Sequence, residues 1–451
     1  MRVPSEAKSL REKHASAGIF DTRFIRLSAR LSTFFLMSSE LCCFVDNYYT
    51  LSSAPIQVPS SLFQKVYFVK RQVAIKQIRL PASDGGGAVV DTNAVDVSEQ
   101  ELLERHPDVL RALLKDHSRT AHEVAKAKKE GRQPAKDQWN IIWGTNNYLG
   151  LGEVGFGEED EITEEKITGA NRLLVRPRAV KEKEIQRQRV RDMAEVFTPA
   201  WVCNAQNNLV DDAWFGRADA FNHEYVDENG VHRWTATEGK IVFAEEPSQK
   251  SARSWKDYVR DVRLEITCGE APYLVSRYDS VTGMPETDLN HRIGLLDRKL
   301  RVVSENTNSS GEWLEWAQEA VKATYGYEWQ GDSLLLAREA VLFTVVDYYR
   351  GKFHQELLDK SLKFFAYIIS WNLWQMDGLK MVIPYSCHEE TDAQMDFFAA
   401  PESRGCPACR DGLMTEHNGI KCVIRDWTKR RDQQKIVFEN VFAKKQGFRE
   451  V

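Results

Sequence analysis

The chain of 451 residues is 42% hydrophobic and 28% charged, a balance that excludes an intrinsically disordered protein and allows a sizeable core. This length predicts two or more domains, or one large domain with additions. The formal net charge of −5 excludes no class of partner, because a basic face can exist within a balanced total.

The first 95 residues give little indication of structure and run into the Gly-rich stretch PASDGGGAVVDTNAVD, which is typical of a linker. We therefore predict a poorly ordered N-terminal extension over residues 1–95. The apolar run LSTFFLMSSELCCFV is shorter than a membrane span, contains Glu40, and lies too far into the chain for a signal peptide. These features predict a cytoplasmic protein that does not enter a membrane.

Residues 96–190 form a helical or mixed region in this interpretation. The stretch VSEQELLERHPDVLRALLKDHS has leucines at helical spacing, and Ser98 with Glu101 forms a capping signal at its start. A basic segment follows, which suits either contacts with phosphate groups or a solvated helix with paired charges. Its cations are Arg172, Arg176, Arg178, Lys181, Lys183, Arg187, Arg189 and Arg191.

From residue 191 onward, predicted strands and helices alternate. RLEIT and YGYEWQ are typical of strands, and FAYIISWNLWQMD and GIKCVIRDW supply two further apolar runs. GLLDRKLRVVSEN, EWLEWAQEAVKATY and GDSLLLAREAVLFTVVDYYRGKF are typical of helices. This alternation predicts an α/β fold, with a parallel sheet and helices on both of its faces.

Ligands of such sheets bind outside the carboxyl ends of the strands, so the residues that follow each strand are candidate site residues. After RLEIT come Cys268, Gly269 and Glu270, where Gly269 would let the backbone pass close to a ligand. After the second strand comes Glu328, whose carboxylate could accept both hydroxyls of a ribose. After the third comes Asp377, whose carboxylate could accept from an adenine amino group.

Four stretches of the chain carry a resemblance to a known family: EVFTPAWVCNAQNNLVDDAWFG, LEITCGEAPYLVSRYD, RIGLLDRKLRVVSEN and IISWNLWQMDG. They resemble bacterial proteins described as restriction endonuclease subunit M, over roughly residues 100–450. The order of motifs is also similar to the S-adenosylmethionine-binding half of adenine-N6 DNA methyltransferases of restriction-modification systems. The resemblance implies a Rossmann-like methyltransferase domain over residues 191–451, S-adenosylmethionine as cofactor and double-stranded DNA as partner. It also admits a restriction or specificity subunit as a second partner.

The resemblance assigns roles to individual residues. Thr198 and Pro199 of the element Phe197-Thr198-Pro199 would contact the methionine portion of the cofactor. The residues Glu265, Cys268, Gly269 and Glu270 would belong to the first cofactor loop, in which Glu265 and Gly269 frame the ligand. Glu328 would bind the ribose and Asp377 the adenine amino group.

The sequence departs from the family at the catalytic loop. Adenine methyltransferases use an Asn/Asp-Pro-Pro-Tyr/Phe tetrapeptide to hold the target amino group and stack on the flipped base, and this chain lacks it. The nearest fragments are VIPYS, with Pro384 and Tyr385, and VIRDW, with Asp426 and Trp427. Asp426 and Trp427 could supply the acceptor and the stacking ring, or could be a cap and a packed side chain.

Three functions follow from these patterns. The first is an adenine-type DNA methyltransferase or a modification subunit, with its catalytic residues unassigned. The second is a non-catalytic, methyltransferase-like DNA-binding or scaffold subunit that needs a partner. The third is a nuclease, for which the best fragment, Glu164 to Thr168, is more typical of a helix surface.

Cysteines crowd near the C-terminus, which favours a metal cluster in a reducing compartment over a disulfide framework. The segment CPACRDGLMTEHNGIKC contains Cys406, Cys409, His417 and Cys422. Three thiolates and an imidazole form a tetrahedral zinc shell, so we predict a structural zinc in a small insertion at about residues 385–422. Cys387 or His388 could replace one of these ligands, and four unrelated residues are the alternative interpretation.

Overall fold

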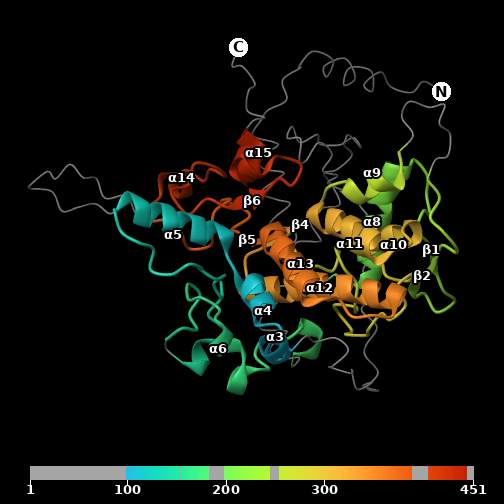
Figure 1. Ribbon diagram of the computed structural model, residues 1–451, viewed down its shortest axis with the longest axis horizontal. Coiled ribbons are helices and arrows are strands. Elements are labelled where there is room, and N and C mark those ends of the chain that lie inside the picture. The colour runs from blue at the N-terminus through green and yellow to red at the C-terminus, as the bar shows by residue number, and fades with distance from the viewer. Residues whose placement is uncertain (1–97, 153, 182–197, 244–252, 389–404, 444–451) are drawn as a thin grey trace, which may run out of the picture. The chain divides into compact units, whose positions relative to one another are not determined.

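The computed structural model describes residues 98–152, 154–181, 198–243, 253–388 and 405–443 (Figure 1). The predicted N-terminal extension, Phe197 and the second half of the basic segment lie outside these ranges. Within them, none of the helices combines the length and the apolarity that a membrane span requires. The labels below are those of Figure 1.

The centre of the described part is a parallel sheet of three strands in the order β3-β4-β5. The strands are β3 (Arg263–Ile266), β4 (Thr324–Glu328) and β5 (Leu373–Gln375). Glu265 lies opposite Gly326, and Glu328 lies opposite Gln375. The α/β prediction with a parallel sheet is confirmed, and both RLEIT and YGYEWQ are strands.

Four helices connect these strands, and the three predicted ones are confirmed. They are α10 (Leu295–Asn306), α11 (Ser310–Lys322), α12 (Gly331–Phe353) and α13 (Asp359–Asn372). The side chain of Ser309 caps α11 by accepting from the Glu312 N–H, and α12 ends where His354 adopts a left-handed conformation. The apolar run FAYIISWNLWQMD divides between α13 and β5, because one stretch of apolar residues satisfies both a buried helix and a buried strand.

The two faces of the sheet are covered differently. One face joins the main core, which α12 crosses with apolar residues on all sides. On the other face, Tyr325 and Trp374 pack against Ile424 and Phe438 near the C-terminus. The fold thus differs from the predicted cover of helices on both faces, because much of the second cover is a small antiparallel sheet.

That small sheet consists of β6 (Val423–Arg425) and β7 (Lys435–Val437), followed by α15 (Glu439–Ala443). The apolar run GIKCVIRDW contains β6, and it does not extend the parallel sheet. Its backbone is paired with β7 instead, and the phenol of Tyr325 donates to the carbonyl of Arg425 over 2.8 Å.

The remaining elements surround this core. They are α3 (Glu99–Arg105), α4 (Pro107–Leu114), α5 (His117–Lys129), η3 (Leu149–Leu151), α6 (Glu164–Ile167), η4 (Gly169–Asn171), η5 (Arg178–Val180), α8 (Ala200–Phe215), β1 (Asn222–Val226), β2 (His232–Ala236), α9 (Trp255–Arg260), α14 (Pro407–Arg410) and η6 (Arg431–Gln433). The Ser98 hydroxyl caps α3, as predicted. β1 and β2 pair as an antiparallel hairpin.

The N-terminal helical region is bonded directly to the sheet. Buried Arg338 of α12 donates to the carbonyls of Leu113 and Leu373, and so joins α4 to β5. The Gln375 side chain accepts from the N–H of Ile142 over 2.9 Å and donates to its carbonyl over 2.9 Å. Gly331 lies against the same segment, where an added Cβ would stand 1.9 Å from the Ile142 oxygen. Only glycine therefore fits at the start of α12.

Candidate functional site

The loops that follow β3 and β4 meet at the carboxyl end of the sheet. The backbone N–H of Gly269 donates to Oε2 of Glu328 over 2.8 Å. Oε1 of Glu328 accepts from the N–H groups of Trp329 and Gln330 over 2.9 and 3.1 Å. The predicted first cofactor loop and the predicted ribose carboxylate are therefore adjacent.

The loop after β3 has an unusual backbone. Thr267, Gly269 and Ala271 have φ angles of 48°, 52° and 63°, in the left-handed region that non-glycine residues rarely adopt. Strain of this kind persists where the surrounding structure enforces it, and it clusters at functional sites. An added Cβ on Gly269 would meet no described atom within 4 Å, so a ligand can approach the backbone there.

The helix α8 is joined to this loop through Tyr273. Pro199 precedes the first turn of α8, and Nδ2 of Asn207 in the same helix donates to the carbonyl of Tyr273 over 2.9 Å. The backbone N–H of Tyr273 donates to Oε1 of Glu265 over 3.4 Å. Burial, with a further contribution from Glu328, raises the pKa of Glu265 well above its usual range and favours the neutral acid. The Thr198 element, about seventy residues upstream, is joined to the segment that follows the loop, because the Ser280 hydroxyl donates to the Thr198 carbonyl over 3.0 Å.

Two side chains of the predicted cofactor loop, those of Cys268 and Glu270, make contacts within the protein. The thiol of Cys268 packs against Gly326, where an added Cβ would lie 3.2 Å from Sγ, and burial raises the pKa of Cys268. Glu270 is buried and accepts from the backbone N–H of Arg178 over 2.7 Å and from the Tyr278 hydroxyl over 2.8 Å. Both side chains hold the loop in shape.

Asp377 lies just beyond β5 and caps the turn that follows it. Its Oδ1 accepts from the N–H groups of Leu379 and Lys380 over 2.9 and 3.2 Å, and its Oδ2 is 3.5 Å from the Lys380 ammonium. The structure connects Asp377 to Glu328 by no direct bond among the described residues. The Asp377 carboxylate lies beyond the third strand, as predicted, and it stabilises the turn that follows this strand.

The two fragments that resemble the missing catalytic tetrapeptide differ in position. Oδ1 of Asp426 accepts from Thr428, and Nε1 of Trp427 donates to Oδ1 of Asn372 over 2.7 Å, so this pair acts as a cap and a packed ring. Tyr385, by contrast, has a φ of 60° and contacts the Trp329 ring edge to face at 5.4 Å. The fragment VIPYS is thus the one that reaches the residue after Glu328.

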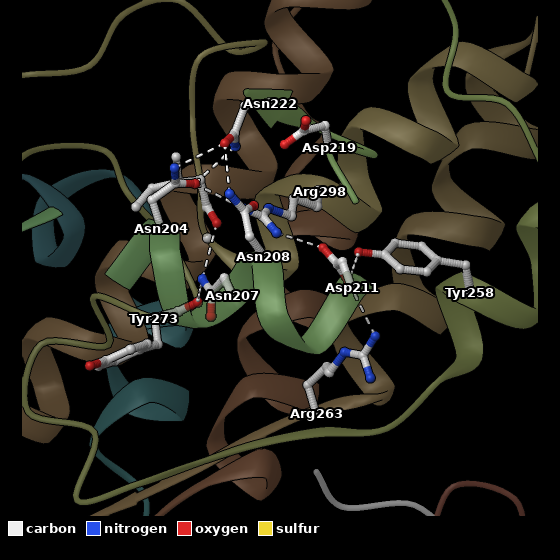
Figure 2. A network of polar contacts seen from close by, with 12 residues as sticks. Asn204, Asn207, Asn208, Asp211, Asp219, Asn222, Tyr258, Arg263, Tyr273 and Arg298 are labelled. Atoms are coloured by element: carbon white, nitrogen blue, oxygen red, sulfur yellow. Dashed lines mark hydrogen bonds and ion pairs between the residues drawn. The ribbon is translucent and has the colours of Figure 1, made fainter. Parts of the chain in front are cut away.

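A buried polar network holds α8 against the sheet, and the sequence interpretation missed it (Figure 2). Asp211 of α8 accepts from Arg298 of α10 over 2.6 Å and from the Tyr258 hydroxyl of α9 over 2.9 Å, and it is 3.4 Å from Arg263 of β3. Arg298 also donates to the side-chain oxygens of Asn204 and Asn208. The sequence did contain a signal for this network, because the polar residues Asn204, Asn208 and Asp211 recur at helical spacing along one face of α8.

A second constellation lies in the C-terminal region, where Cys387, Cys406, Cys409 and His417 bring their ligand atoms within 4.8 Å of one another. The distances from Nδ1 of His417 to the three Sγ atoms are 3.7, 3.6 and 3.4 Å. Zinc bonds of about 2.3 Å to sulfur and 2.0 Å to nitrogen in a tetrahedron separate S and N ligands by about 3.6 Å. The cluster therefore has the dimensions of a tetrahedral metal site.

The surroundings of the cluster prepare it for a metal ion. Nε2 of His417 is 2.9 Å from the carbonyl of Leu413, which favours the tautomer that leaves Nδ1 free to bind a metal. Burial opposes ionisation of Cys406, but N–H groups of Asn418 and Cys409 and the His417 ring outweigh it and lower the pKa of Cys406 to about 6. Burial and the neighbouring thiols raise the pKa of Cys387 to about 12.

The fourth ligand corrects the predicted set. Cys387 completes the cluster, as the sequence allowed, whereas Cys422 is fully buried in the apolar cluster beneath β5. The Cys422 thiol lies 3.5 Å from the carbonyl of Gln375, and burial raises the pKa of Cys422 well above its usual range. Spacing alone favoured Cys422, which lies five positions after His417, over Cys387, which lies 30 positions before it, and only the fold decides which one faces the His417 ring.

Comparison with family models, with curated proteins and with solved structures found no match for this chain. Its function therefore has to be inferred from the site itself.

Proposed function

We propose that this chain is an S-adenosylmethionine-dependent DNA methyltransferase of the adenine-N6 type, or the modification subunit of a restriction-modification system. In this proposal Gly269 and Glu265 frame the cofactor, Glu328 binds the ribose, and Thr198 and Pro199 contact the methionine portion. Partners are double-stranded DNA and a restriction or specificity subunit.

The bond between Gly269 and Glu328 is the observation that carries the proposal. It joins the two loops that must act together on a nucleoside, at the edge of a parallel sheet where ligands of such sheets bind. The open space over Gly269 lets a ligand approach the loop. When a ribose binds, its hydroxyls would replace some of the backbone N–H groups that donate to the Glu328 carboxylate. In the proposal, Asp377 affects adenine binding only indirectly, because its carboxylate caps the turn that follows β5.

We further propose that the Cys387, Cys406, Cys409 and His417 cluster binds a structural zinc ion. Four protein ligands close the coordination shell, so the ion would supply no open position for catalysis. It would tie the segment after β5 to the C-terminal segment, which are also joined by the Ile383 N–H donating to the Ile420 carbonyl over 2.9 Å.

The cofactor proposal is tested by isothermal titration calorimetry of the full chain with S-adenosylmethionine, followed by a methyl-incorporation assay on mixed genomic DNA. Saturable heat and labelled N6-methyladenine are expected. Absence of heat with folded protein would overturn the cofactor assignment. If the chain alone gives binding heat without methylation, and methylation appears when neighbouring gene products are added, the chain is a modification subunit.

A second candidate function is a non-catalytic, methyltransferase-like DNA-binding or scaffold subunit. Asp426 and Trp427, which could have replaced the missing tetrapeptide, are both occupied by contacts within the protein. Methylation that stays absent with every neighbouring gene product, despite cofactor binding, would favour this candidate.

A further inference from the structure

A cavity of about 250 Å³ lies between the hairpin β1–β2 and the first turns of α8. Its walls include the rings of Trp201, His232 and Trp234 and the polar groups of Asn204 and Glu224, and its lining also contains Arg233. None of these residues belongs to the proposed cofactor or metal site, although Asn204 is also part of the buried network of α8. The cavity combines aromatic faces with a carboxylate and an amide in a space suited to one small heterocycle.

The hairpin register builds one wall of the cavity. Glu224 lies opposite Trp234, and Val226 lies opposite His232. Because side chains alternate along a strand, these four residues share one face of the hairpin. The His232 ring stacks on Trp201 of α8 with centroids 4.0 Å apart and planes 9° apart, so this face is the one that meets α8.

The indole ring of Trp234 is held in place by His291. Nε1 of Trp234 donates to the carbonyl of His291 over 3.0 Å, and its ring stacks on the His291 ring at 4.9 Å. The Asp227 carboxylate holds the hairpin turn by accepting from Val231 over 2.9 Å and from Arg233 over 2.6 Å. The aromatic wall is therefore supported before any ligand arrives.

The Glu224 carboxylate is suited to a hydrogen-bond donor. Its Oε1 accepts from the side-chain amides of Asn204 and Asn208, and no group among the described residues donates to Oε2. Burial, together with the carboxylate of Asp219, raises the pKa of Glu224, which a donor at Oε2 would counteract. The Glu224 carboxylate favours an amino group as its ligand, and the guanidinium of the lining residue Arg233 is already paired with Asp227.

We propose that this cavity binds one unstacked nucleobase that carries an exocyclic amino group, with the face of Trp201 that His232 does not cover as the stacking surface and Glu224 as the acceptor of the amino hydrogens. Stacking on aromatic side chains with hydrogen bonds to the base edge is how proteins read an extruded base. That the base belongs to DNA rests on the proposed function. The cavity supplies the two features that the missing Asn/Asp-Pro-Pro-Tyr loop would have supplied.

The location agrees with this assignment. Trp201 stands three residues after Thr198, in the first turn of α8. α8 is also bonded to the cofactor loop, because Nδ2 of Asn207 donates to the carbonyl of Tyr273 over 2.9 Å. A base in the cavity and a cofactor at Gly269 would thus both lie against elements that are bonded to α8, which the Asp211 network holds in place.

The test is a titration of the full chain with deoxyadenosine and the 2′-deoxyriboside of purine, which lacks only the amino group, in the presence of saturating S-adenosylhomocysteine. The added S-adenosylhomocysteine prevents deoxyadenosine from occupying the cofactor site. Deoxyadenosine is expected to bind about tenfold more tightly than the purine deoxyriboside, as one charged hydrogen bond implies. The pair deoxycytidine and the 2′-deoxyriboside of 2-pyrimidinone is measured in the same way. Preference for the amino base in either pair supports the proposal, and equal affinities in both pairs overturn it.

Variants assign the binding to the cavity. Glu224→Gln retains an oxygen for the bonds from Asn204 and Asn208, and should reduce the preference to about twofold or less. Trp201→Ala should weaken both nucleosides about tenfold, and Trp201→Phe, which keeps an aromatic ring for packing, should restore most of it. The control is His223→Ala, on the opposite face of the hairpin, which should leave both affinities unchanged. Unchanged binding in Glu224→Gln and Trp201→Ala would refute the assignment.

The failure of this proposal can be told apart from failure of the proposed function. Calorimetric binding of S-adenosylmethionine without any nucleoside preference would remove the base cavity and leave the cofactor site. A nucleoside preference in a chain that binds no S-adenosylmethionine would leave the cavity and remove the cofactor assignment.

Discussion

The backbone N–H of Gly269 donates to Oε2 of Glu328 over 2.8 Å, although the two residues are 59 positions apart in the chain. The bond crosses from the loop after β3 to the end of β4, and it closes the carboxyl edge of the sheet. In the proposed function, a ligand bound at this edge would contact both loops.

Replacing Glu328 by Gln is expected to weaken S-adenosylmethionine binding about tenfold while the fold persists. The single oxygen of Gln can accept either from the Gly269 N–H or from the N–H groups of Trp329 and Gln330, and a neutral acceptor binds ribose hydroxyls less strongly than a carboxylate does. Calorimetry of both proteins measures the loss. Glu315→Ala, which removes an exposed carboxylate from α11, is the matched control and should bind as the unmodified chain does.

The metal cluster predicts a difference between two cysteines that the sequence could not distinguish. Cys406→Ser should reduce bound zinc from about one ion per chain to a trace, because a closed tetrahedral site needs all four ligands. Cys422→Ala should keep the full metal content, since Cys422 lies outside the cluster. Elemental analysis after dialysis measures both. Zinc retained by Cys406→Ser and lost from Cys422→Ala would reverse the assignment.

The stability of the fold should depend on pH through Asp297. Burial raises the pKa of Asp297 from 3.8 to about 6, against the opposing effects of Arg292 and Ser276. Between these values the folded chain binds more protons than the unfolded chain, so the free energy of unfolding falls as pH rises from about 4 to about 6. The full change is on the order of 3 kcal/mol.

Asp297→Asn should flatten this part of the stability profile, because the amide does not titrate and its oxygen still accepts from Ser276. Urea denaturation at pH 4.5 and pH 7 provides the two free energies. A variant that keeps the slope of the unmodified chain would show that another group is responsible.

The buried network around α8 predicts a large loss of stability in Arg298→Ala. The substitution leaves Asp211 buried with one of its charged partners removed, and breaking a buried pair in this way costs about 3 to 5 kcal/mol. Arg260→Ala is the control, since its ion pair with Glu319 is largely exposed and contributes at most about 1 kcal/mol. Equal losses in the two variants, measured by urea denaturation, would contradict this view of the network.

The sequence by itself determined the parts that depend on local pattern. Apolar periodicity located α10, α11 and α12, the two strands β3 and β4, and the Ser98 cap of α3, because these signals arise from neighbouring residues. Strand order then located the loops that hold Gly269 and Glu328, since the carboxyl ends of parallel strands share one edge. Short-range spacing also identified Cys406, Cys409 and His417 as members of a cluster that could hold a metal ion.

Only the tertiary structure decided the relationships that depend on packing. Pairing of β6 with β7, and not with the parallel sheet, is set by contacts with Tyr325 and Trp374 on the second face. The choice of Cys387 over Cys422 follows from which thiol the chain turns toward His417. The polar network of Asp211 and the cavity of Trp201 and Glu224 join residues of several elements, and side-chain directions across elements are not encoded in any local pattern.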